Sequence, residues 1–241
     1  MQREIERQRR RLSSSDTEER RDAVMRLGGM KRPDSSRVAA LALKDASEIV
    51  RATAASAVLS LPPDEAAAVL LPLLQDKREF VRQEAAYALG QTRSRTAVAG
   101  LLTRLEEDKQ AGVRGAAAVA LGMIGDDAAT VSLARRLDPG FAASAKRRGK
   151  KEDNEFVQRA AAVALGQIRS RAAVPALISA MRNERASDDV RREAARALGL
   201  IGDASAVPAL REATAARDPY LSRLASEALR RISPADTKLP S

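Results

Sequence analysis

The chain contains no cysteine, histidine or tryptophan, and only 2% of its 241 residues are aromatic. Without cysteine it has no disulfide, no thiolate nucleophile and no cysteine-ligated zinc or iron–sulfur site. Without histidine, Ser–His and Cys–His catalysis and imidazole metal ligation are excluded. Carboxylates, lysine, serine, threonine and two tyrosines remain for chemistry. We therefore expect no cofactor and no metal.

The rest of the composition indicates a folded, soluble protein. Apolar residues make up 44% and charged residues 31%, and 42 Lys and Arg against 32 Asp and Glu give a net charge of +10. The segment Met1 to Arg7 is charged and is not a signal sequence. The longest apolar stretch, Ala66 to Leu74, is far shorter than the roughly 20 residues of a membrane span. We expect a cytoplasmic protein with no membrane partner.

A ten-residue pattern repeats along the chain. We number its positions so that Val81 is position 1 and Gly90 is position 10. The seven copies share alanine at position 5, and successive copies are 31, 31, 32, 44, 33 and 31 residues apart. They are Glu19–Gly28, Val50–Leu59, Val81–Gly90, Val113–Gly122, Val157–Gly166, Val190–Gly199 and Leu221–Arg230. Seven copies in register indicate a repeat protein.

Each copy has the spacing of a helix. Val81, Ala85 and Leu89 recur at i, i+4 and i+8, which forms one thin apolar stripe. Glycine at position 10 predicts the helix end, where positive φ is favoured. A second apolar stripe follows after a short turn, as at Leu101 and Leu105. Each unit is therefore a helical hairpin, and no segment alternates with period two as a strand would.

One hairpin is too small to bury its own apolar face, but stacked hairpins form a continuous core. We predict an all-α fold, a right-handed α-α superhelix (solenoid) of about seven hairpins in a single domain. The predicted ranges are 1–232 for the domain, 2–12 with 17–28 for the first hairpin, 205–215 with 218–232 for the last, and 233–241 for a disordered tail.

The pattern Asp-x-x-x-x-Val-Arg-x-x-Ala-Ala-x-Ala-Leu-Gly, present at Asp76–Gly90 and Asp108–Gly122, resembles the HEAT repeat. More narrowly, it is similar to the HEAT-like repeats of the phycobilisome (PBS) lyase type. The resemblance implies that the second helix of each hairpin lines the concave side of the solenoid, and that the protein holds a partner. The motif is specific for architecture and says little about function.

The arginine at position 2 has two interpretations. It occurs as Arg20, Arg51, Arg82, Arg114 and Arg191. Either these arginines form a stripe that binds an anionic partner, or they form an internal ladder with the aspartates that stand six residues before Arg51, Arg82 and Arg114. We favour the ladder, because a partly buried arginine needs a paired carboxylate.

No catalytic constellation stands out. The acid pairs Asp126–Asp127 and Asp188–Asp189 fall at predicted helix starts, where carboxylates cap free N–H groups. There is neither a phosphate-binding glycine loop nor a nucleophile elbow. Deoxyhypusine hydroxylase and alkylpurine glycosylase, two enzymes built on HEAT-like repeats, rely on His-Glu motifs and on tryptophan, which this chain lacks. We predict that it is not an enzyme.

Two groups of basic residues lie outside the helical pattern. The spacing of 44 marks an insertion, predicted as a basic loop at about 139–153. Either this loop contacts phosphates or an acidic protein surface, or it is a solvated spacer without a partner. Its basic residues are Lys146, Arg147, Arg148, Lys150 and Lys151. The turns Arg93–Arg95 and Arg169–Arg171 form either a broken basic rim or ordinary exposed turns.

Positions 3 and 7 of the repeated helices vary while the packing positions do not, so we expect them to face the groove. The candidate partner-binding residues are Gln83, Tyr87, Val119, Arg159, Val163, Arg192 and Arg196. Tyr87 is the expected anchor, since aromatic side chains dominate binding energy. This surface predicts a non-enzymatic scaffold that binds another protein. The expected partner has an acidic segment that carries an apolar residue.

Two alternatives remain. The net charge of +10 allows non-specific nucleic-acid binding through phosphates, although stacking aromatics are scarce. The narrower resemblance implies a bilin lyase subunit or a chromophore-handling chaperone, although this chain has no thiol to hold a bilin.

Overall fold

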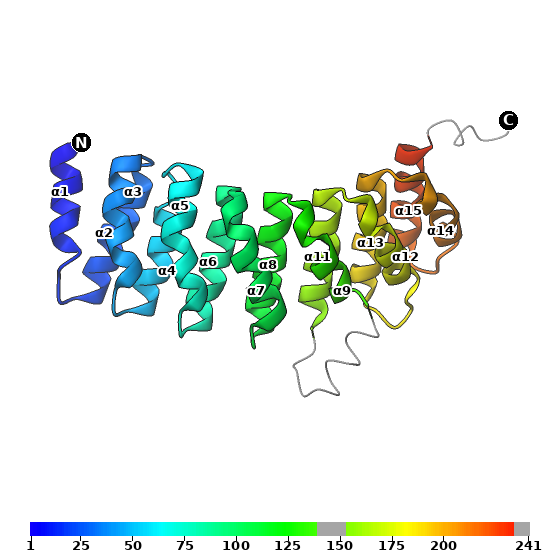
Figure 1. The fold of residues 1–241 in the computed structure, drawn as a ribbon, viewed down its shortest axis with the longest axis horizontal. Coiled ribbons are helices and arrows are strands. Elements are labelled where there is room, and N and C mark those ends of the chain that lie inside the picture. The colour runs from blue at the N-terminus through cyan, green and yellow to red at the C-terminus, as the bar shows by residue number, and fades with distance from the viewer. Residues whose placement is uncertain (139–152, 234–241) are drawn as a thin grey trace.

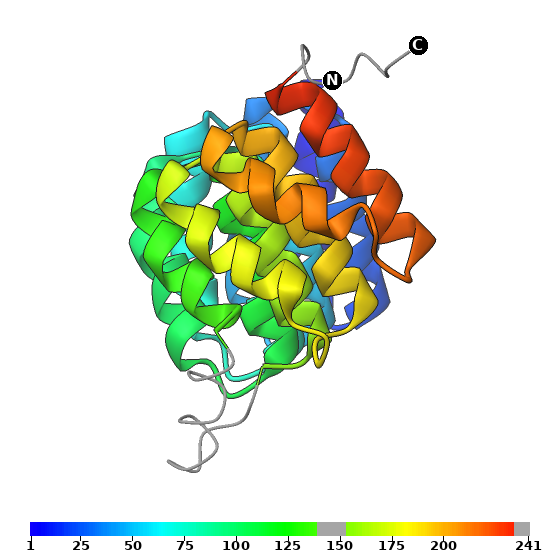
Figure 2. The same cartoon turned by 90° about the vertical axis from the view of Figure 1, so that its right-hand side faces the viewer.

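The computed structural model describes residues 1–138 and 153–233, which form 14 α-helices and six short 3₁₀-helices and contain no strand. The helices pair into seven antiparallel hairpins that stack in chain order from the N-terminus to the C-terminus (Figure 1). Viewed from the C-terminal end, successive hairpins are offset around the axis of the stack (Figure 2). The predicted α solenoid is confirmed.

The second helices of the hairpins, which carry the repeated pattern, form one layer that we call the inner layer. They are α2 (Thr17–Gly29), α4 (Glu48–Ala57), α6 (Glu79–Thr92), α8 (Ala111–Ile124), α11 (Glu155–Ile168), α13 (Asp188–Ile201) and α15 (Pro219–Ile232).

The first helices of the hairpins form the outer layer. They are α1 (Gln2–Arg11), α3 (Pro33–Ala39), α5 (Pro63–Leu70), α7 (Val98–Glu107), α9 (Thr130–Arg136), α12 (Val174–Arg182) and α14 (Val207–Ala213). The 3₁₀-helices extend or precede these outer helices. They are η1 (Ala40–Lys44), η2 (Leu71–Gln75), η3 (Arg95–Ala97), η4 (Asp127–Ala129), η5 (Arg171–Ala173) and η6 (Ala204–Ala206).

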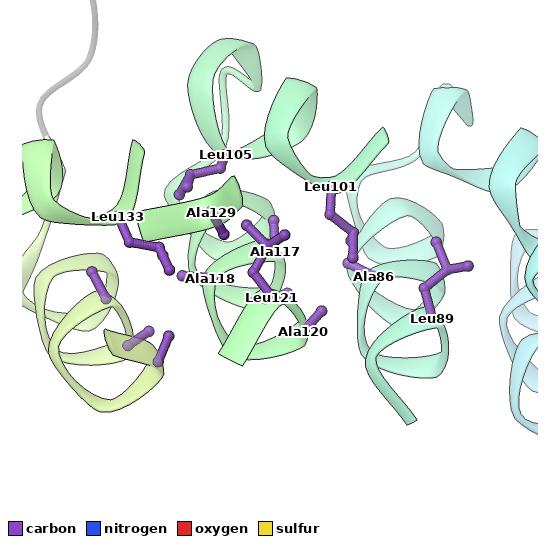
Figure 3. Close-up of a cluster of buried hydrophobic side chains, with 14 of the residues drawn as sticks. Ala86, Leu89, Leu101, Leu105, Ala117, Ala118, Ala120, Leu121, Ala129 and Leu133 are labelled. Atoms are coloured by element: carbon purple, nitrogen blue, oxygen red, sulfur yellow. The ribbon is translucent and has the colours of Figure 1, made fainter. Parts of the chain in front are cut away.

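The core lies between the two layers. Leu89 and Leu121 of the inner layer meet Leu101, Leu105 and Leu133 of the outer layer, and all five side chains are fully buried (Figure 3). Alanines beside these leucines bring the helices close together. Burial of leucine contributes about 2 kcal/mol per side chain, so the repeated stripe is the main source of stability.

Glycine at position 10 does not end the helix, contrary to the sequence prediction. Helix α6 continues past Gly90 to Thr92, and its left-handed end residue is Arg93, with φ of 54°. Gly125 and Gly202 end α8 and α13 in the same conformation. The glycine at position 10 instead faces the alanine at position 8 of the next inner helix. A Cβ on Gly122 would lie 2.7 Å from Ala164 Cα.

This glycine–alanine contact recurs along the inner layer. The pairs are Gly28–Ala57, Gly90–Ala120, Gly122–Ala164, Gly166–Ala197 and Gly199–Ala228. Successive inner helices contact each other extensively, whereas α7, α9, α12 and α14 of the outer layer make few contacts with one another. In a stack of two-helix units, the layer whose helices lie closer together is on the concave side. The close glycine–alanine contacts of the inner layer agree with the expectation that it lines the concave side.

Candidate binding surface

The predicted binding residues share one surface of the inner layer. Gln83 and Tyr87 lie on α6, and Val119 on α8. Arg159 and Val163 lie on α11, and Arg192 and Arg196 on α13. All seven side chains are half-buried or exposed, unlike the stripe at positions 1, 5 and 9. Positions 3 and 7 are one helical turn apart and lie on the same helix face. We call this surface the inner face.

The sequence prediction considered only positions 3 and 7 and missed four further residues of the inner face, each of which directly precedes position 1. They are Ile49, Phe80, Phe156 and Tyr220. Phe156 is half-buried, and the other three large hydrophobic side chains are exposed. Position 0, as we call this place, is three and seven residues before positions 3 and 7, so it continues the same face. The signal was available, since three of the five aromatic residues occupy position 0.

Position 0 of one helix meets position 3 of the helix before it. The Phe156 ring lies over Gly115, where any Cβ would collide with it, and Gln83 lies against Gly112. Farther along, Arg159 and Asp189 approach to 3.8 Å. The inner face is thus an interlocked row of side chains, and Gly112 and Gly115 of α8 allow Gln83 and the Phe156 ring to approach its backbone.

Arg192 is engaged within the chain. Its Nε and Nη2 donate to Asp218 at 2.7 and 2.9 Å, and its Nη1 donates to Asp189 at 3.0 Å. Its guanidinium also lies 5.0 Å from the centre of the Tyr220 ring. The hydrogen bonds to Asp218 raise the pKa of Arg192 above its ordinary value. Arg192 therefore orders the α13–α15 junction.

Arg196 and Arg223 differ from Arg192 in this respect. Arg196 approaches Glu193 only to 3.7 Å, and Arg223 approaches Glu227 only to 3.8 Å. Their side chains are 55% and 65% exposed. Exposed pairs at such distances contribute little, so these guanidiniums are accessible to a partner.

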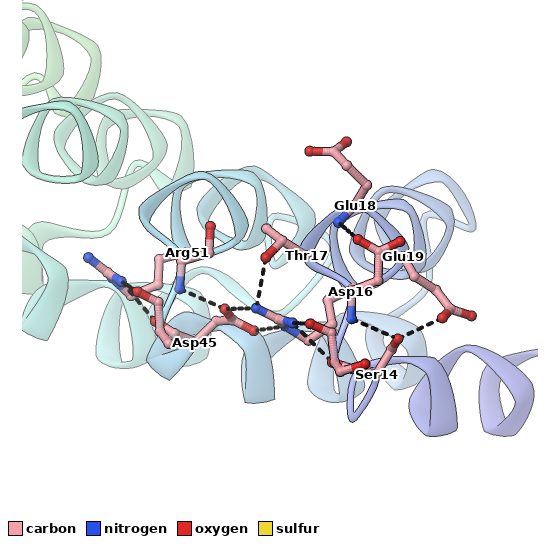
Figure 4. A network of polar contacts seen from close by, with 11 residues as sticks. Ser14, Asp16, Thr17, Glu18, Glu19, Asp45 and Arg51 are labelled. Carbon is pink, nitrogen blue, oxygen red and sulfur yellow. Dashed lines mark hydrogen bonds and ion pairs between the residues drawn. The ribbon is translucent and has the colours of Figure 1, made fainter.

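Four of the five arginines at position 2 form the predicted internal ladder. Arg191 instead donates to Met181 O at 3.1 Å and approaches Asp188 of its own helix at 3.5 Å. Arg20, Arg51 and Arg82 each donate from Nε and Nη2 to an aspartate 25 or 26 residues ahead, at 2.7 to 3.0 Å. Their acceptors are Asp45, Asp76 and Asp108. Figure 4 shows the network around Asp45 and Arg51. The carboxylate thus belongs to the next hairpin and not to the arginine's own.

The aspartate six residues before each arginine contributes its backbone. Asp45 O accepts from Arg51 Nη1 at 2.8 Å, and Asp76 O accepts from Arg82 Nη1 at 2.8 Å. The same carboxylates accept backbone N–H groups two residues ahead, which closes the hairpin turns. Each aspartate therefore links two hairpins. The ladder interpretation is confirmed, and these arginines are not a stripe for a partner.

The ladder continues at Asp153, the last residue of the predicted basic loop. Arg114 Nε donates to Asp153 at 2.6 Å, and Arg136 Nη1 at 3.3 Å. The three side chains are 4 to 7% exposed. Lys146, Arg147, Arg148, Lys150 and Lys151 lie outside the described residues.

The ladder changes the protonation behaviour of its acids. Burial raises the pKa values of Asp45, Asp76 and Asp108, but hydrogen bonds from their arginines and from backbone N–H groups lower them more. The net pKa values lie below the ordinary aspartate value. These carboxylates are therefore ionised partners of the arginines at neutral pH.

The basic turns also find acids. Arg95 approaches Asp126, and Arg171 approaches Asp203, both at 3.5 Å, although both arginines are largely exposed. Asp126 also caps the helix start by accepting from Ala128 N, as predicted. At the other acid pair, Ser187 is the cap, and Asp188 and Asp189 lie in the first turn of α13.

Within residues 1–138 and 153–233, no three acidic, histidine or cysteine side chains are grouped as metal ligands would be. No helix in this part of the chain is long and apolar enough to cross a membrane. The inner face, with its mixed apolar and basic side chains, is the strongest candidate for a functional surface.

Stacked two-helix units with an inner layer of repeated helices define an α solenoid. Models of HEAT repeats match residues 9–90, 69–148 and 148–230, so the chain belongs to the HEAT-repeat family. The resemblance stated from the sequence is confirmed.

Solved structures agree on the fold. The chain is similar to the complex of CpcE and CpcF of phycocyanin lyase from Nostoc sp. PCC7120, with a TM-score of 0.55 and 22% identity over 98% of this chain and 90% of that one. An engineered protein matches with a TM-score of 0.55 and 23% identity, over 95% and 68%. No curated protein matched this chain.

Proposed function

We propose that this chain is a non-enzymatic scaffold that binds an acidic protein segment on its inner face. The observation that carries the proposal is the contrast between two sets of arginines. Arg20, Arg51, Arg82 and Arg114 at position 2 are engaged in the ladder. Arg159, Arg196 and Arg223, in contrast, are at least half exposed and have ion pairs of 3.7 to 3.8 Å.

Apolar side chains lie beside these arginines. Tyr87 and Val119 pack on the core with one side and stay partly accessible, and Phe80 is 48% exposed. An acidic segment with an apolar residue matches this mixture, because the apolar contact supplies affinity and the charges supply orientation and rate. The HEAT family, whose members generally hold protein partners, supports the same function.

Two other functions are tested against this one. Nucleic-acid binding would use the net charge of +10, but many of the arginines already face carboxylates, and aromatic stacking platforms are few. A role beside a bilin lyase is suggested by the narrower sequence resemblance and by the fold shared with the CpcE–CpcF complex. In either role, the inner face is the surface that we expect to contact the partner.

The test is capture of partners from a native lysate of the source organism by the immobilised chain. We expect wild type to retain acidic proteins that Tyr87→Ala/Arg159→Glu loses. The control is Val131→Ala/Arg182→Glu on the outer layer, which makes the same change of charge. Identical partner sets for the two variants would overturn the proposal. Partners removed by nuclease would indicate nucleic-acid binding instead.

A further inference from the structure

A small pocket lies on the inner face between α13 and α15, the last two inner helices. Its lining includes the apolar residues Leu200, Leu224, Gly199 and Ala228, which we call the floor. The charged residues of the lining, which we call the rim, are Arg196, Glu227 and Arg231. The pocket holds about 230 Å³, which suits a single residue and not a helix.

The last junction lacks a cover that three earlier junctions have. At Gly90, Gly122 and Gly166, a side chain from position 11 of the next helix lies over the glycine. These side chains are Met123, Gln167 and Leu200, whose nearest atoms would come within 3.3 Å of a Cβ on the glycine. Position 11 of α15 is Arg231, and only Ala228 atoms come within 3.8 Å of the corresponding point on Gly199.

The rim carries two cations that are free for a ligand. Arg196 has only the 3.7 Å contact with Glu193, and Arg231 is exposed and forms no ion pair within the described part of the chain. The acid on the rim, Glu227, lies 3.8 Å from Arg223. An apolar floor below two guanidiniums favours a ligand that joins an apolar group to an anion.

We propose that this pocket binds the C-terminal residue of a partner polypeptide, and this inference rests on the proposed function. The terminal side chain lies on Leu200 and Leu224, and the α-carboxylate lies between Arg196 and Arg231. Glu227 accepts the N–H of the same residue. A C-terminal residue with an aliphatic or aromatic side chain supplies the apolar group and the carboxylate together, whereas an internal aspartate or glutamate supplies only the carboxylate.

The test follows the leucine methyl signals of Leu200 and Leu224 during titration with four peptides. Each is acetyl-Glu-Asp-Glu-Gly followed by Leu, Val, Ile or Phe, prepared as the free acid and as the C-terminal amide. We expect at least one free acid to shift both methyl signals saturably, and its amide to bind at least roughly tenfold more weakly, because the amide loses the charged contact.

Arg196→Gln/Arg231→Gln is expected to remove the preference for the free acid. Arg185→Gln/Arg217→Gln, which loses the same charge at exposed sites, is expected to retain it. No shift with any peptide, equal binding of acid and amide, or equal behaviour of the two variants would overturn the inference. Such a result would leave the proposed function intact if Tyr87→Ala/Arg159→Glu still loses the captured partners. The proposed function itself would be contradicted if capture did not depend on Tyr87 and Arg159.

Discussion

Glycine at position 10 acts through the space that it leaves for the next helix. At Gly122, a methyl group would meet both Cα and Cβ of Ala164, at 2.7 and 2.8 Å. Backbone atoms cannot move aside as a flexible side chain can, so the two helices would have to separate along their length. Replacement of the glycine is therefore costly although alanine is the better helix former.

We predict that Gly122→Ala lowers the free energy of unfolding by about 2 kcal/mol, the cost of overpacking a core, as measured by urea denaturation. The matched control is Gly29→Ala at the end of α2, where no atom lies within 4 Å of the added methyl group. That change is expected to be neutral or to stabilise by about 0.5 kcal/mol. Equal effects of the two substitutions would show that the glycine contacts do not set the helix spacing.

Some residue roles could not be predicted from the pattern. Glycine at position 10 has the same sequence signature whether it ends a helix or admits a neighbour, and only the tertiary contact distinguishes the two. Arg93 and Arg169 adopt φ of 54° and 60°, which their side chains disfavour and which no sequence rule assigns to them. The place of Phe80 and Tyr220 on the inner face could have been predicted from the sequence, since position 0 shares a helix face with position 3.

Neighbouring hairpins are joined by the ladder as well as by the core. Each rung places a guanidinium between a carboxylate of the next hairpin and a carbonyl of its own, and the Asp108 side chain is only 2% exposed. Removal of one partner from such a pair leaves a buried charge without compensation. The ladder thus makes each hairpin sensitive to the loss of its neighbour.

We predict that Asp108→Asn lowers the free energy of unfolding by about 3 kcal/mol at pH 7. Because the folded-state pKa of Asp108 is lowered, the wild-type carboxylate stabilises fully above the unfolded pKa of about 4. This stability is lost as pH falls through the folded pKa, so the difference between variant and wild type shrinks below about pH 4. Urea denaturation at several pH values between neutral and strongly acidic measures it.

The exposed pair Arg37–Glu65 provides the comparison for the ladder. It has a similar N–O distance of 2.8 Å, but both side chains are more than a third exposed. Glu65→Gln is expected to change stability little, because solvent screens the pair. A pH-independent effect of Asp108→Asn would contradict the assignment of its stability to the ionised carboxylate.

The insertion between α9 and α11 interrupts the repeat spacing without interrupting the ladder. Leu137 before the insertion and Val157 after it are buried, and Asp153 pairs with Arg114 and Arg136. The last residue of the insertion, Asp153, therefore contributes to the stack. The basic residues 146–151 lie outside the described residues, and their role as a partner contact stays a prediction.

We predict that deletion of residues 142–151 leaves the melting temperature nearly unchanged and weakens binding to an anionic partner, as high salt would. Asp153→Asn in the full chain is expected to lower stability by about 3 kcal/mol, since Arg114 and Arg136 lose the charge of a carboxylate that contacts both of them. Thermal unfolding of both variants makes the test. A large loss of stability in the deletion variant would show that the insertion is structural.

At the scale of the whole molecule, the sequence predicted the architecture well. Seven alanines in register at position 5 specify seven helices, and the apolar stripe between the copies specifies their partner helices. Because a single hairpin cannot bury its own apolar face, the hairpins must stack to bury it. The sequence could not show that a carboxylate reaches the preceding hairpin, because a spacing of six residues fits a contact within one hairpin equally well.

The ladder has a consequence for how such a chain can grow. The two units that contain Asp45 with Arg51 and Asp76 with Arg82 each provide one aspartate to the arginine behind and one arginine to the aspartate ahead, 25 or 26 residues apart. A duplicated unit of the same length brings both halves of this exchange. It can enter the gene at a boundary between these units and leave no charge without a counterpart. A fragment of a unit would bring an arginine or an aspartate without its counterpart. The ladder therefore favours growth of the chain by duplication of whole units.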